Sequence, residues 1–333
     1  MPDLPLVSVI TPCYNGEAYL DRYFESILRQ TYPNIELIFV NDGSTDRTEE
    51  LALSYRDRLE ARGIRYLYIA QENTGVSGAV NTGLQHFRGD YLTWPDSDDW
   101  MTPDCIAKKV AYLEAHPEKG LVQCRSAVVD EHAPETVIGY MYRHNTSNGW
   151  IFDDYLFGVD TVTACGSWLV RSDAFRETHP SGQIVDEYNA GQNYQMLLPT
   201  LYRYECGFLP DVLYFIVVRE ESHSHRDKDY ASKRKRSCAF QSILRRILTE
   251  LDMPEETRQA YFERLDLSYA KRRLQLAMRY HQKDELKKEY ALLREKKACS
   301  KTDTFRYLRG VCPPVDAICT PVLGLWMRLR HGK

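Results

Sequence analysis

The chain has 333 residues, 43% of them hydrophobic and 27% charged, which is enough for one large domain with an appendage or for two domains. Its net charge of −4 is unevenly distributed, because residues 1–225 carry 17 Lys/Arg against 33 Asp/Glu while residues 226–333 carry 26 against 14. An acidic body of this kind argues against nucleic acid as a partner. The basic C-terminal region is a candidate for peripheral contact with an anionic membrane surface.

The cysteines and the amino terminus bear on the compartment. Nine cysteines are scattered from Cys13 to Cys319 without a CxxC pair or a zinc-type spacing, a pattern that predicts reduced thiols. The first residues, MPDLPLVSVITP, are acidic where a signal peptide is basic. No stretch reaches the roughly 20 apolar residues that span a bilayer. We therefore expect a cytoplasmic protein, with the inner face of the plasma membrane as the candidate site of peripheral contact.

Short β-rich apolar runs alternate with helical patterns in the first part of the chain. In chain order these runs are Leu6–Thr11, Ala18–Arg29, Ile35–Val40, Thr45–Leu59, Ile64–Ile69, Gly75–His86 and Tyr91–Trp94. The alternation predicts βαβ units and hence an α/β fold with a mostly parallel central sheet. In open sheets of this class, ligands bind outside the carboxyl ends of the strands, where the polar loops lie.

Later elements are less regular. A strand at Ser167–Val170, a helix at 190–203 and a strand at Phe208–Val218 are expected before the composition turns basic. In the basic region that follows, apolar residues recur at helical spacing, which predicts amphipathic helices. The predicted organisation is an α/β domain over 1–225, with a nucleotide-binding half at 1–105 and an acceptor-side half at 106–225, followed by a mainly helical region at 226–333.

Three carboxylates follow the predicted strand that ends at Trp94, namely Asp96, Asp98 and Asp99. Carboxylates crowded together repel one another, and Mg²⁺ or Mn²⁺ relieves the repulsion while leaving coordination positions for a diphosphate. The same residues, taken alone, also fit an Asp-rich turn that caps the helix beginning near Pro103, with Asp99 as the cap. Both interpretations stay open at this point.

Two further loops lie at strand ends. Asp42 follows the second predicted strand, where its carboxylate can accept the imide N–H of a pyrimidine base. Tyr14 occupies the equivalent position after the first strand and can stack on that base. Each feature alone is also typical of an ordinary strand-to-helix connection.

Together these loops resemble the inverting glycosyltransferases of family 2, which have the GT-A fold. The matching text is VSVITPCYNGEAYLDRYFESILRQTYPNIELIFVNDGSTDRT, followed by ENTGVSGAVNTGLQHFRGDYLTWPDSDDWMTPD. The resemblance is close over residues 6–105 and looser over 160–225. It implies a GT-A-type nucleotide-sugar-binding fold, a divalent metal, and transfer of a sugar from a nucleotide-sugar donor.

The resemblance also implies roles for individual residues. Those expected to bind the donor are Pro12, Tyr14, Asn15, Glu17, Asp42, Asn81, Asp96 and Arg219. Those expected to bind the metal are Asp98, Asp96 and His223. One departure is Val80, which stands where many relatives carry an arginine that reaches the donor. Neutralisation of the diphosphate is therefore expected to rely more on the metal.

The catalytic base is the weakest match to the family pattern. Relatives carry a Glu-Asp pair just before a helix, whereas this chain has Gln192 and Asn193, whose amides accept no proton usefully. Asp186 and Glu187, a few residues upstream, are the remaining candidates for the base, with Gln192 and Asn193 then binding acceptor hydroxyls. The other interpretation of Asp186 and Glu187 is a pair of exposed loop carboxylates.

The predicted function is transfer of a sugar, by resemblance from a UDP-sugar, to a saccharide or lipid-linked saccharide acceptor. Family analogy places it in bacterial surface polysaccharide or glycolipid assembly. One alternative is a nucleotide-sugar-binding or scaffold protein with impaired catalysis, which Gln192 and Asn193 suggest. Another is a sugar nucleotidyltransferase, although the loop PCYNGEAYL lacks the Gly-rich basic character such an enzyme needs. A Rossmann dehydrogenase is excluded because no G-x-G-x-x-G follows the first strand.

Overall fold

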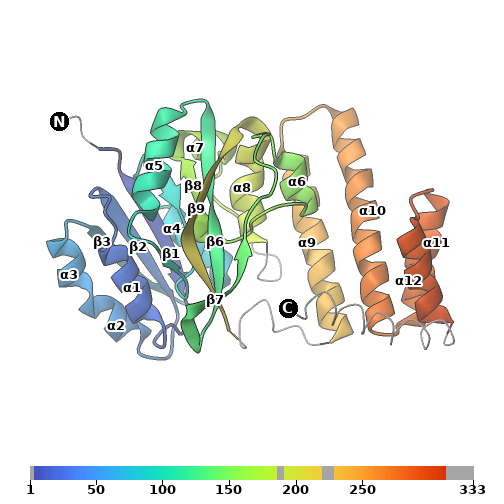
Figure 1. The fold of residues 1–333 in the computed structure, drawn as a ribbon, viewed down its shortest axis with the longest axis horizontal. Helices are drawn as coiled ribbons and strands as arrows, with labels where there is room; N and C mark the ends of the chain where they lie inside the picture. Colours follow the sequence, from blue (N-terminus) through green and yellow to red (C-terminus); the bar gives the residue numbers. More distant parts are fainter. Residues whose placement is uncertain (1–3, 186–190, 220–228, 313–333) are drawn as a thin grey trace. The chain divides into compact units, whose positions relative to one another are not determined.

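The computed structural model describes residues 4–185, 191–219 and 229–312 (Figure 1). The chain divides into two compact units, Met1–Ser222 and His223–Lys333. The described part of the first unit contains a sheet with helices packed on it, and the described part of the second consists of helices.

The described residues of the first unit form a nine-stranded sheet in the order β3-β2-β1-β4-β8-β6-β9-β5, with β7 paired to β6. The strands are β1 (Val7–Cys13), β2 (Ile35–Asp42), β3 (Arg65–Gln71), β4 (Tyr91–Thr93), β5 (Trp100–Met101), β6 (Lys119–Asp130), β7 (Ala133–Met141), β8 (Trp168–Arg171) and β9 (Glu205–Val218). Strands β3, β2, β1 and β4 run parallel, as do β6 and β9. The pairs β4–β8, β6–β8, β6–β7 and β5–β9 are antiparallel. The predicted α/β class and its parallel half-sheet are confirmed.

The helices of the first unit follow the predicted pattern, with one difference. They are α1 (Leu20–Leu28), α2 (Thr48–Ser54), α3 (Arg56–Ala61), α4 (Gly75–Leu84), α5 (Cys105–Ala115), α6 (Phe152–Phe157), α7 (Ser172–Thr178) and α8 (Gln192–Arg203). The single helix predicted over Thr45–Leu59 is wrong, because the chain breaks at Tyr55 between α2 and α3. At the break the Tyr55 ring stacks on Phe24 of α1, with the ring centroids 4.7 Å apart.

Strands β1 and β2 are buried on both faces, which explains why they read as largely apolar runs. Alternate residues of β1 point to opposite faces, so Val9 packs in the core shared with α1 while Ile10 faces α4. A Cβ on Gly83 of α4 would lie 2.3 Å from Ile10, so α4 can approach the sheet only with glycine at this position.

The second unit forms four helices within residues 229–312: α9 (Tyr230–Glu250), α10 (Glu255–Arg279), α11 (Lys283–Glu295) and α12 (Lys301–Val311). Apolar residues of α10 and α11 form its core. Arg273 of α10 links three helices, because it donates to Glu289 of α11 at 2.7 Å and to Gln241 of α9 at 2.6 Å. The predicted helical C-terminal region is confirmed. Among the described helices, none combines the length and apolarity that crossing a membrane requires.

Candidate active site

The loops that follow β1 and β2 are hydrogen-bonded to each other. Asn15 accepts from the backbone N–H of Thr45 at 2.8 Å, and Glu17 accepts from the backbone N–H of Arg47 at 2.9 Å. Asn15 has φ of 52°, a left-handed conformation that Asn tolerates better than most residues. Both side chains were expected to line the nucleotide pocket, and in the structure their oxygens fix the shape of these two loops.

Pro12 and Tyr14 lie at the end of β1. Pro12 pairs with Val40 of β2 and is half-buried. Tyr14 is the first residue after the strand, and 41% of its surface is exposed. A tyrosine ring left exposed at the carboxyl end of a buried parallel strand is placed where a planar base can stack on it.

Asp42 ends β2 and is 3% exposed. One oxygen accepts from Gln71 Nε2 at 2.7 Å and from the Thr74 N–H at 2.9 Å, and the other accepts from the Gly75 N–H at 2.9 Å. The carboxylate therefore holds the loop between β3 and α4 against the end of β2. Its Oδ2 accepts one of these bonds, and an ionised carboxylate oxygen can accept a second.

Asn81 lies on α4 and contacts a distant segment. Its amide donates to the carbonyl of Ile184 at 2.7 Å and accepts from the Ile184 N–H at 2.8 Å. Gln195 of α8 accepts from the N–H of the next residue, Val185, at 2.7 Å. Asn81 was expected beside the donor, but the structure shows that it fixes the backbone just before residue 186. Asp186 and Glu187 themselves lie outside the described residues.

Asp96 is surrounded by groups from three other segments. Its backbone N–H donates to the Tyr214 hydroxyl of β9 at 3.2 Å, and its carboxylate accepts from the Cys165 thiol at 3.2 Å. Burial and the negative charge of Asp98 raise the pKa of Asp96 to about 6, although Cys165 and Arg219 act in the opposite direction. Ionisation of Asp96 therefore costs free energy, because its carboxylate is buried and lies near the charge of Asp98.

Asp98 and Arg219, both named from the sequence, meet in the structure. Arg219 Nη2 lies 2.5 Å from Asp98 Oδ2, and its guanidinium sits over the Tyr19 ring at 4.6 Å. Arg22 of α1 donates to the Asp98 carbonyl at 3.0 Å. The acidic loop is therefore bordered by two guanidinium groups, in a position suited to an anionic ligand.

Asp99 does not cap the next helix, so that interpretation is wrong. It is 4% exposed and accepts from the backbone N–H of Val217 in β9 at 2.8 Å. Burial, together with the charges of Asp98 and Asp96, raises the pKa of Asp99 well above its usual range. Asp99 therefore joins the acidic loop to β9.

A divalent cation suits this loop, as judged from its charges. Asp96 and Asp98 are close enough to raise the pKa of Asp96, and a cation removes that repulsion. No group of three or more His, Cys, Asp or Glu side chains in the described part of the chain is arranged to hold a metal. His223, the expected third ligand, lies outside the described residues. Asp96 and Asp98 are thus the two described carboxylates that could hold a cation.

Asn193, in the first turn of α8, has its side-chain amide engaged on both sides. Its Oδ1 accepts from Trp94 Nε1 at 3.0 Å, and its Nδ2 donates to the Thr163 carbonyl at 2.9 Å and to Cys165 Sγ at 3.3 Å. Because Cys165 in turn donates to Asp96, the amide supports the acidic loop. Gln192 begins the helix and is half-buried.

Residues 8–179 match the family model described as "Glycosyl transferase family 2". The chain belongs to this family. The resemblance inferred from the sequence is confirmed, and membership of the family makes the enzyme class a glycosyltransferase.

The curated relatives of this family 2 glycosyltransferase match it in part. It is 38% identical over 146 residues to the glycosyltransferase GlyA of Streptococcus pneumoniae, covering 44% of this chain and 18% of the relative. It is 40% identical over 128 residues to an uncharacterised glycosyltransferase of Rickettsia typhi, covering 38% of each. It is 29% identical over 246 residues to the uncharacterised glycosyltransferase EpsJ of Bacillus subtilis, covering 69% of each. The chain thus spans less than two fifths of the length of the first two relatives.

Solved structures share the fold. TarS of S. aureus, residues 1–349 in complex with UDP-GlcNAc, has a TM-score of 0.60 and 17% identity, covering 94% of this chain and 83% of that one. The mannosyltransferase PcManGT from Pyrobaculum calidifontis, in complex with GDP-Man and Mn²⁺, has a TM-score of 0.57 and 18% identity, covering 98% and 81%. The expected GT-A-type fold is confirmed.

The Glu-Asp position of family 2 gives a direct prediction for Asn193. Changing Asn193 to Asp keeps the acceptor for Trp94 but removes both donors and puts a negative charge against the Thr163 carbonyl. We expect the free energy of unfolding to fall by about 2 kcal/mol, with no gain in turnover. Urea unfolding and donor turnover measure the two effects, and the comparison is Asn193→Ala, which loses all three bonds, the one from Trp94 included, without adding a charge. A variant as stable as the wild type and more active would contradict the structural role of Asn193.

Several residues of the site carry no signal in the sequence. Arg22, Cys165 and Tyr214 contact the acidic loop from α1, from the turn before β8 and from β9. A Cβ on Gly166 would lie 2.1 Å from the Tyr214 ring, so glycine here lets that tyrosine reach Asp96. Such contacts depend on sheet pairing between distant segments, which local patterns do not encode.

Proposed function

We propose that this family 2 enzyme transfers a sugar from a UDP-linked donor to a saccharide or lipid-linked saccharide acceptor, with Mn²⁺ or Mg²⁺ as cofactor. The observation that supports the proposal is the acidic loop, where Asp98 contacts both Arg219 and Arg22 and its charge acts on the buried Asp96. It is also supported by the ligands of proteins with the same fold, which are UDP-GlcNAc in TarS and GDP-Man with Mn²⁺ in PcManGT. Bacterial surface polysaccharide or glycolipid assembly is the proposed setting.

The residues of this chain divide the work between base, diphosphate and acceptor. Tyr14 stacks on the uracil and Asp42 Oδ2 accepts its imide N–H. Asp96 and Asp98 would hold the divalent cation, which would supply charge neutralisation to the departing diphosphate. Arg219 pairs with Asp98, and a guanidinium at this position would donate to a phosphate of the donor.

On the acceptor side, Asp186 or Glu187 takes the proton from the attacking hydroxyl. The hydroxyl oxygen forms a bond to the anomeric carbon from the face opposite the diphosphate. The bond between that carbon and the diphosphate oxygen breaks, and its electron pair leaves with the nucleoside diphosphate. Gln192, at the start of α8, is placed to bind an acceptor hydroxyl.

Donor hydrolysis tests this proposal against its alternatives. Purified protein is incubated with a panel of nucleotide sugars and Mn²⁺, and the released nucleotide is identified. Release of UDP from one UDP-sugar supports the transferase. Affinity for a nucleotide sugar without release supports the binding or scaffold protein that Asn193 favours, since its amide occupies the family base position. Pyrophosphate release from a nucleoside triphosphate indicates a nucleotidyltransferase, and no affinity for any of these ligands contradicts all three.

The basic region 226–333 is proposed to make peripheral contact with the inner face of the plasma membrane. Phe305 and Leu308 are 40% and 44% exposed on one side of α12, in a unit rich in Lys and Arg. We expect the protein to co-sediment with vesicles containing anionic phospholipid and to be released by high salt. Equal binding to neutral vesicles, or none to either, would contradict the proposal.

A further inference from the structure

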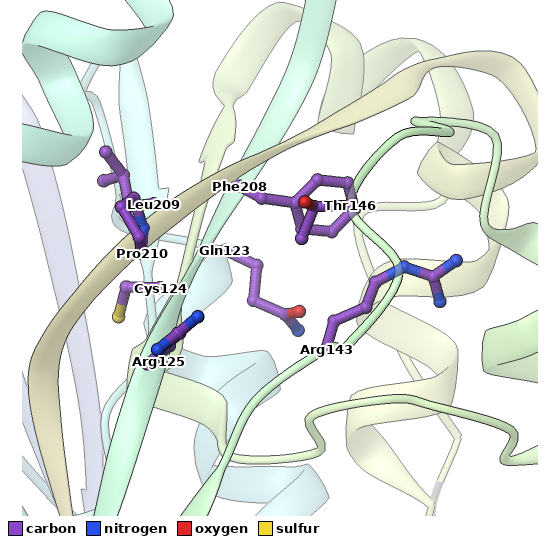
Figure 2. A pocket seen from close by; sticks show the side chains of 8 residues that line it. All are labelled: Gln123, Cys124, Arg125, Arg143, Thr146, Phe208, Leu209 and Pro210. Atoms are coloured by element: carbon purple, nitrogen blue, oxygen red, sulfur yellow. The ribbon is translucent and has the colours of Figure 1, made fainter.

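A pocket of about 200 Å³ lies on the β6–β9 part of the sheet (Figure 2), and neither Asp42 nor Asp98 is among the residues that line it. The side chains that matter for its chemistry are those of Gln123, Arg125, Arg143, Thr146, Phe208 and Pro210. They come from β6, from β9 and from the segment after β7. The proposed transferase mechanism does not use them.

The pocket arises from an irregularity in strand pairing. Cys124 pairs with Leu209, but the next residue, Arg125, pairs with Val212, so Pro210 and Asp211 have no partner on β6. Such bulges are common beside ligand sites, because they redirect side chains. Cys124 and Leu209 pack into the core on one face. By alternation, Gln123 and Arg125 point to the opposite face, as Figure 2 shows.

Arg125 carries the uncompensated charge of the pocket. It is exposed, its guanidinium lies over the Tyr142 ring at 4.9 Å, and it forms no ion pair with any carboxylate in the described ranges. Arg143, in contrast, is 5% exposed and is paired with Asp154 at 2.6 Å. Its guanidinium extends away from Gln123 and Arg125 in Figure 2. One positive charge is thus available to a ligand.

The remaining groups suit a sugar ring. The Phe208 ring and Pro210 offer flat apolar surface, and Thr146 offers a hydroxyl. Gln123 donates through Nε2 to the Val162 carbonyl at 3.2 Å, which orients its amide. The hydrogen bond of this side chain within the described part of the chain runs through Nε2, which leaves Oε1 as an acceptor for a sugar hydroxyl. Pockets with apolar walls and a few converging polar groups are typical of small-molecule sites.

We propose that this pocket binds a hexose unit that carries an anionic group, a carboxylate or a phosphate, and that this unit belongs to the acceptor. The anion meets Arg125, and the ring lies against Phe208. The assignment to the acceptor rests on the proposed transferase function, whereas the binding itself does not.

One segment connects the pocket to the acidic loop, which is why we assign the ligand to the acceptor. On the pocket side, the Asp160 carbonyl accepts from Arg143 at 3.0 Å and the Val162 carbonyl accepts from Gln123. On the other side, the Thr163 carbonyl accepts from Asn193, and Cys165 donates to Asp96. The residues that hold Arg143 and Gln123 of the pocket are thus followed directly along the chain by the residues that support Asp96.

The test measures binding of glucuronate, glucose 6-phosphate and glucose to the full chain by saturation-transfer NMR, with UDP binding measured in parallel. We expect the two anionic sugars to bind and glucose to bind at least tenfold more weakly. Arg125→Gln should weaken the anionic sugars about tenfold and leave UDP affinity unchanged. The matched control is Arg88→Gln, at an exposed arginine before β4, which should change neither. The Asp98→Asn variant should keep the anionic sugars, because Asp98 is no part of the pocket.

Each other outcome overturns the proposal. Equal binding of glucose and glucuronate shows that no anion is recognised, and absence of binding shows that the pocket is not a sugar site. Loss of the sugars in Asp98→Asn but not in Arg125→Gln places them in the nucleotide site. The two proposals also fail separately. If UDP binds and the anionic sugars do not, the pocket is refuted alone, and the reverse result refutes the donor assignment alone.

Discussion

Replacing Asp98 by asparagine is expected to lower the rate of UDP release from the donor by about 10²- to 10³-fold. The change removes the negative charge that attracts the cation while keeping the size of the side chain. It also frees Arg219, whose nitrogen lies 2.5 Å from the carboxylate in the structure. We expect that Arg219 alone cannot take over the role of the cation. The negative charge that develops on the departing diphosphate in the transition state would then be less well neutralised. The measurement is UDP release at saturating donor across a Mn²⁺ titration.

A second aspartate near the same loop provides the matched control. Asp104 precedes α5 and forms an ion pair with Lys108 of that helix. Its side chain is 43% exposed, and it takes no part in the acidic loop. Asp104→Asn should therefore keep its turnover within about twofold, since exposed ion pairs contribute little. Thermal unfolding of both variants separates loss of charge from loss of fold. Full turnover of Asp98→Asn in the presence of a chelator would refute the role of Asp98 in metal binding.

The first half of the fold could be predicted from the sequence because its strands follow one another closely in the chain, and β1 and β2 are buried on both faces. β1, β2 and β3 lie within two residues of the predicted runs, and the loop after each strand carries the polar residues. The second half depends on pairing across long separations. β6 pairs with β9 over 86 residues at Lys119 and Glu205, and β5 has only two residues. A strand of two residues shows no periodicity, so the sequence predicts β8, α8 and β9 in this half but not β5 or the pairing of the strands.

The candidate site divides in the same way. Asp42, Asp96 and Asp98 could be named because carboxylates directly after buried strands are unusual without a ligand or a partner. The sequence does not show that the side chains of Asn15, Glu17 and Asn81 form hydrogen bonds with backbone groups of other segments. A polar side chain that binds a loop and one that binds a nucleotide look alike in a sequence. The two kinds of side chain differ in whether their hydrogen-bond partner belongs to the protein or to a ligand. Only the tertiary structure determines which partner is within reach.

Amide substitutions at Asp186 and Glu187 are expected to separate the catalytic base from its neighbour. One of Asp186→Asn and Glu187→Gln should lower kcat by about 10²- to 10⁴-fold at saturating donor, and the other should change it little. The physical reason is that an amide cannot take the proton of the acceptor hydroxyl. Neither Gln192 nor Asn193 can replace the lost carboxylate, and Asn193 is held by Trp94, Thr163 and Cys165.

The structure describes Ile184 and Val185, which directly precede Asp186 and Glu187 in the chain. Ile184 is held by Asn81 and Val185 by Gln195, so the chain enters residue 186 from a fixed position beside α8. Donor KM should therefore stay unchanged in the impaired variant, because the donor loops lie on other strands. Glu177→Gln, which removes a surface ion pair with Arg203, is the control and should retain full kcat. If both variants turn over like the wild type, no carboxylate of this segment is the base. The engaged amide of Asn193 then favours a protein that binds its nucleotide sugar without transferring it.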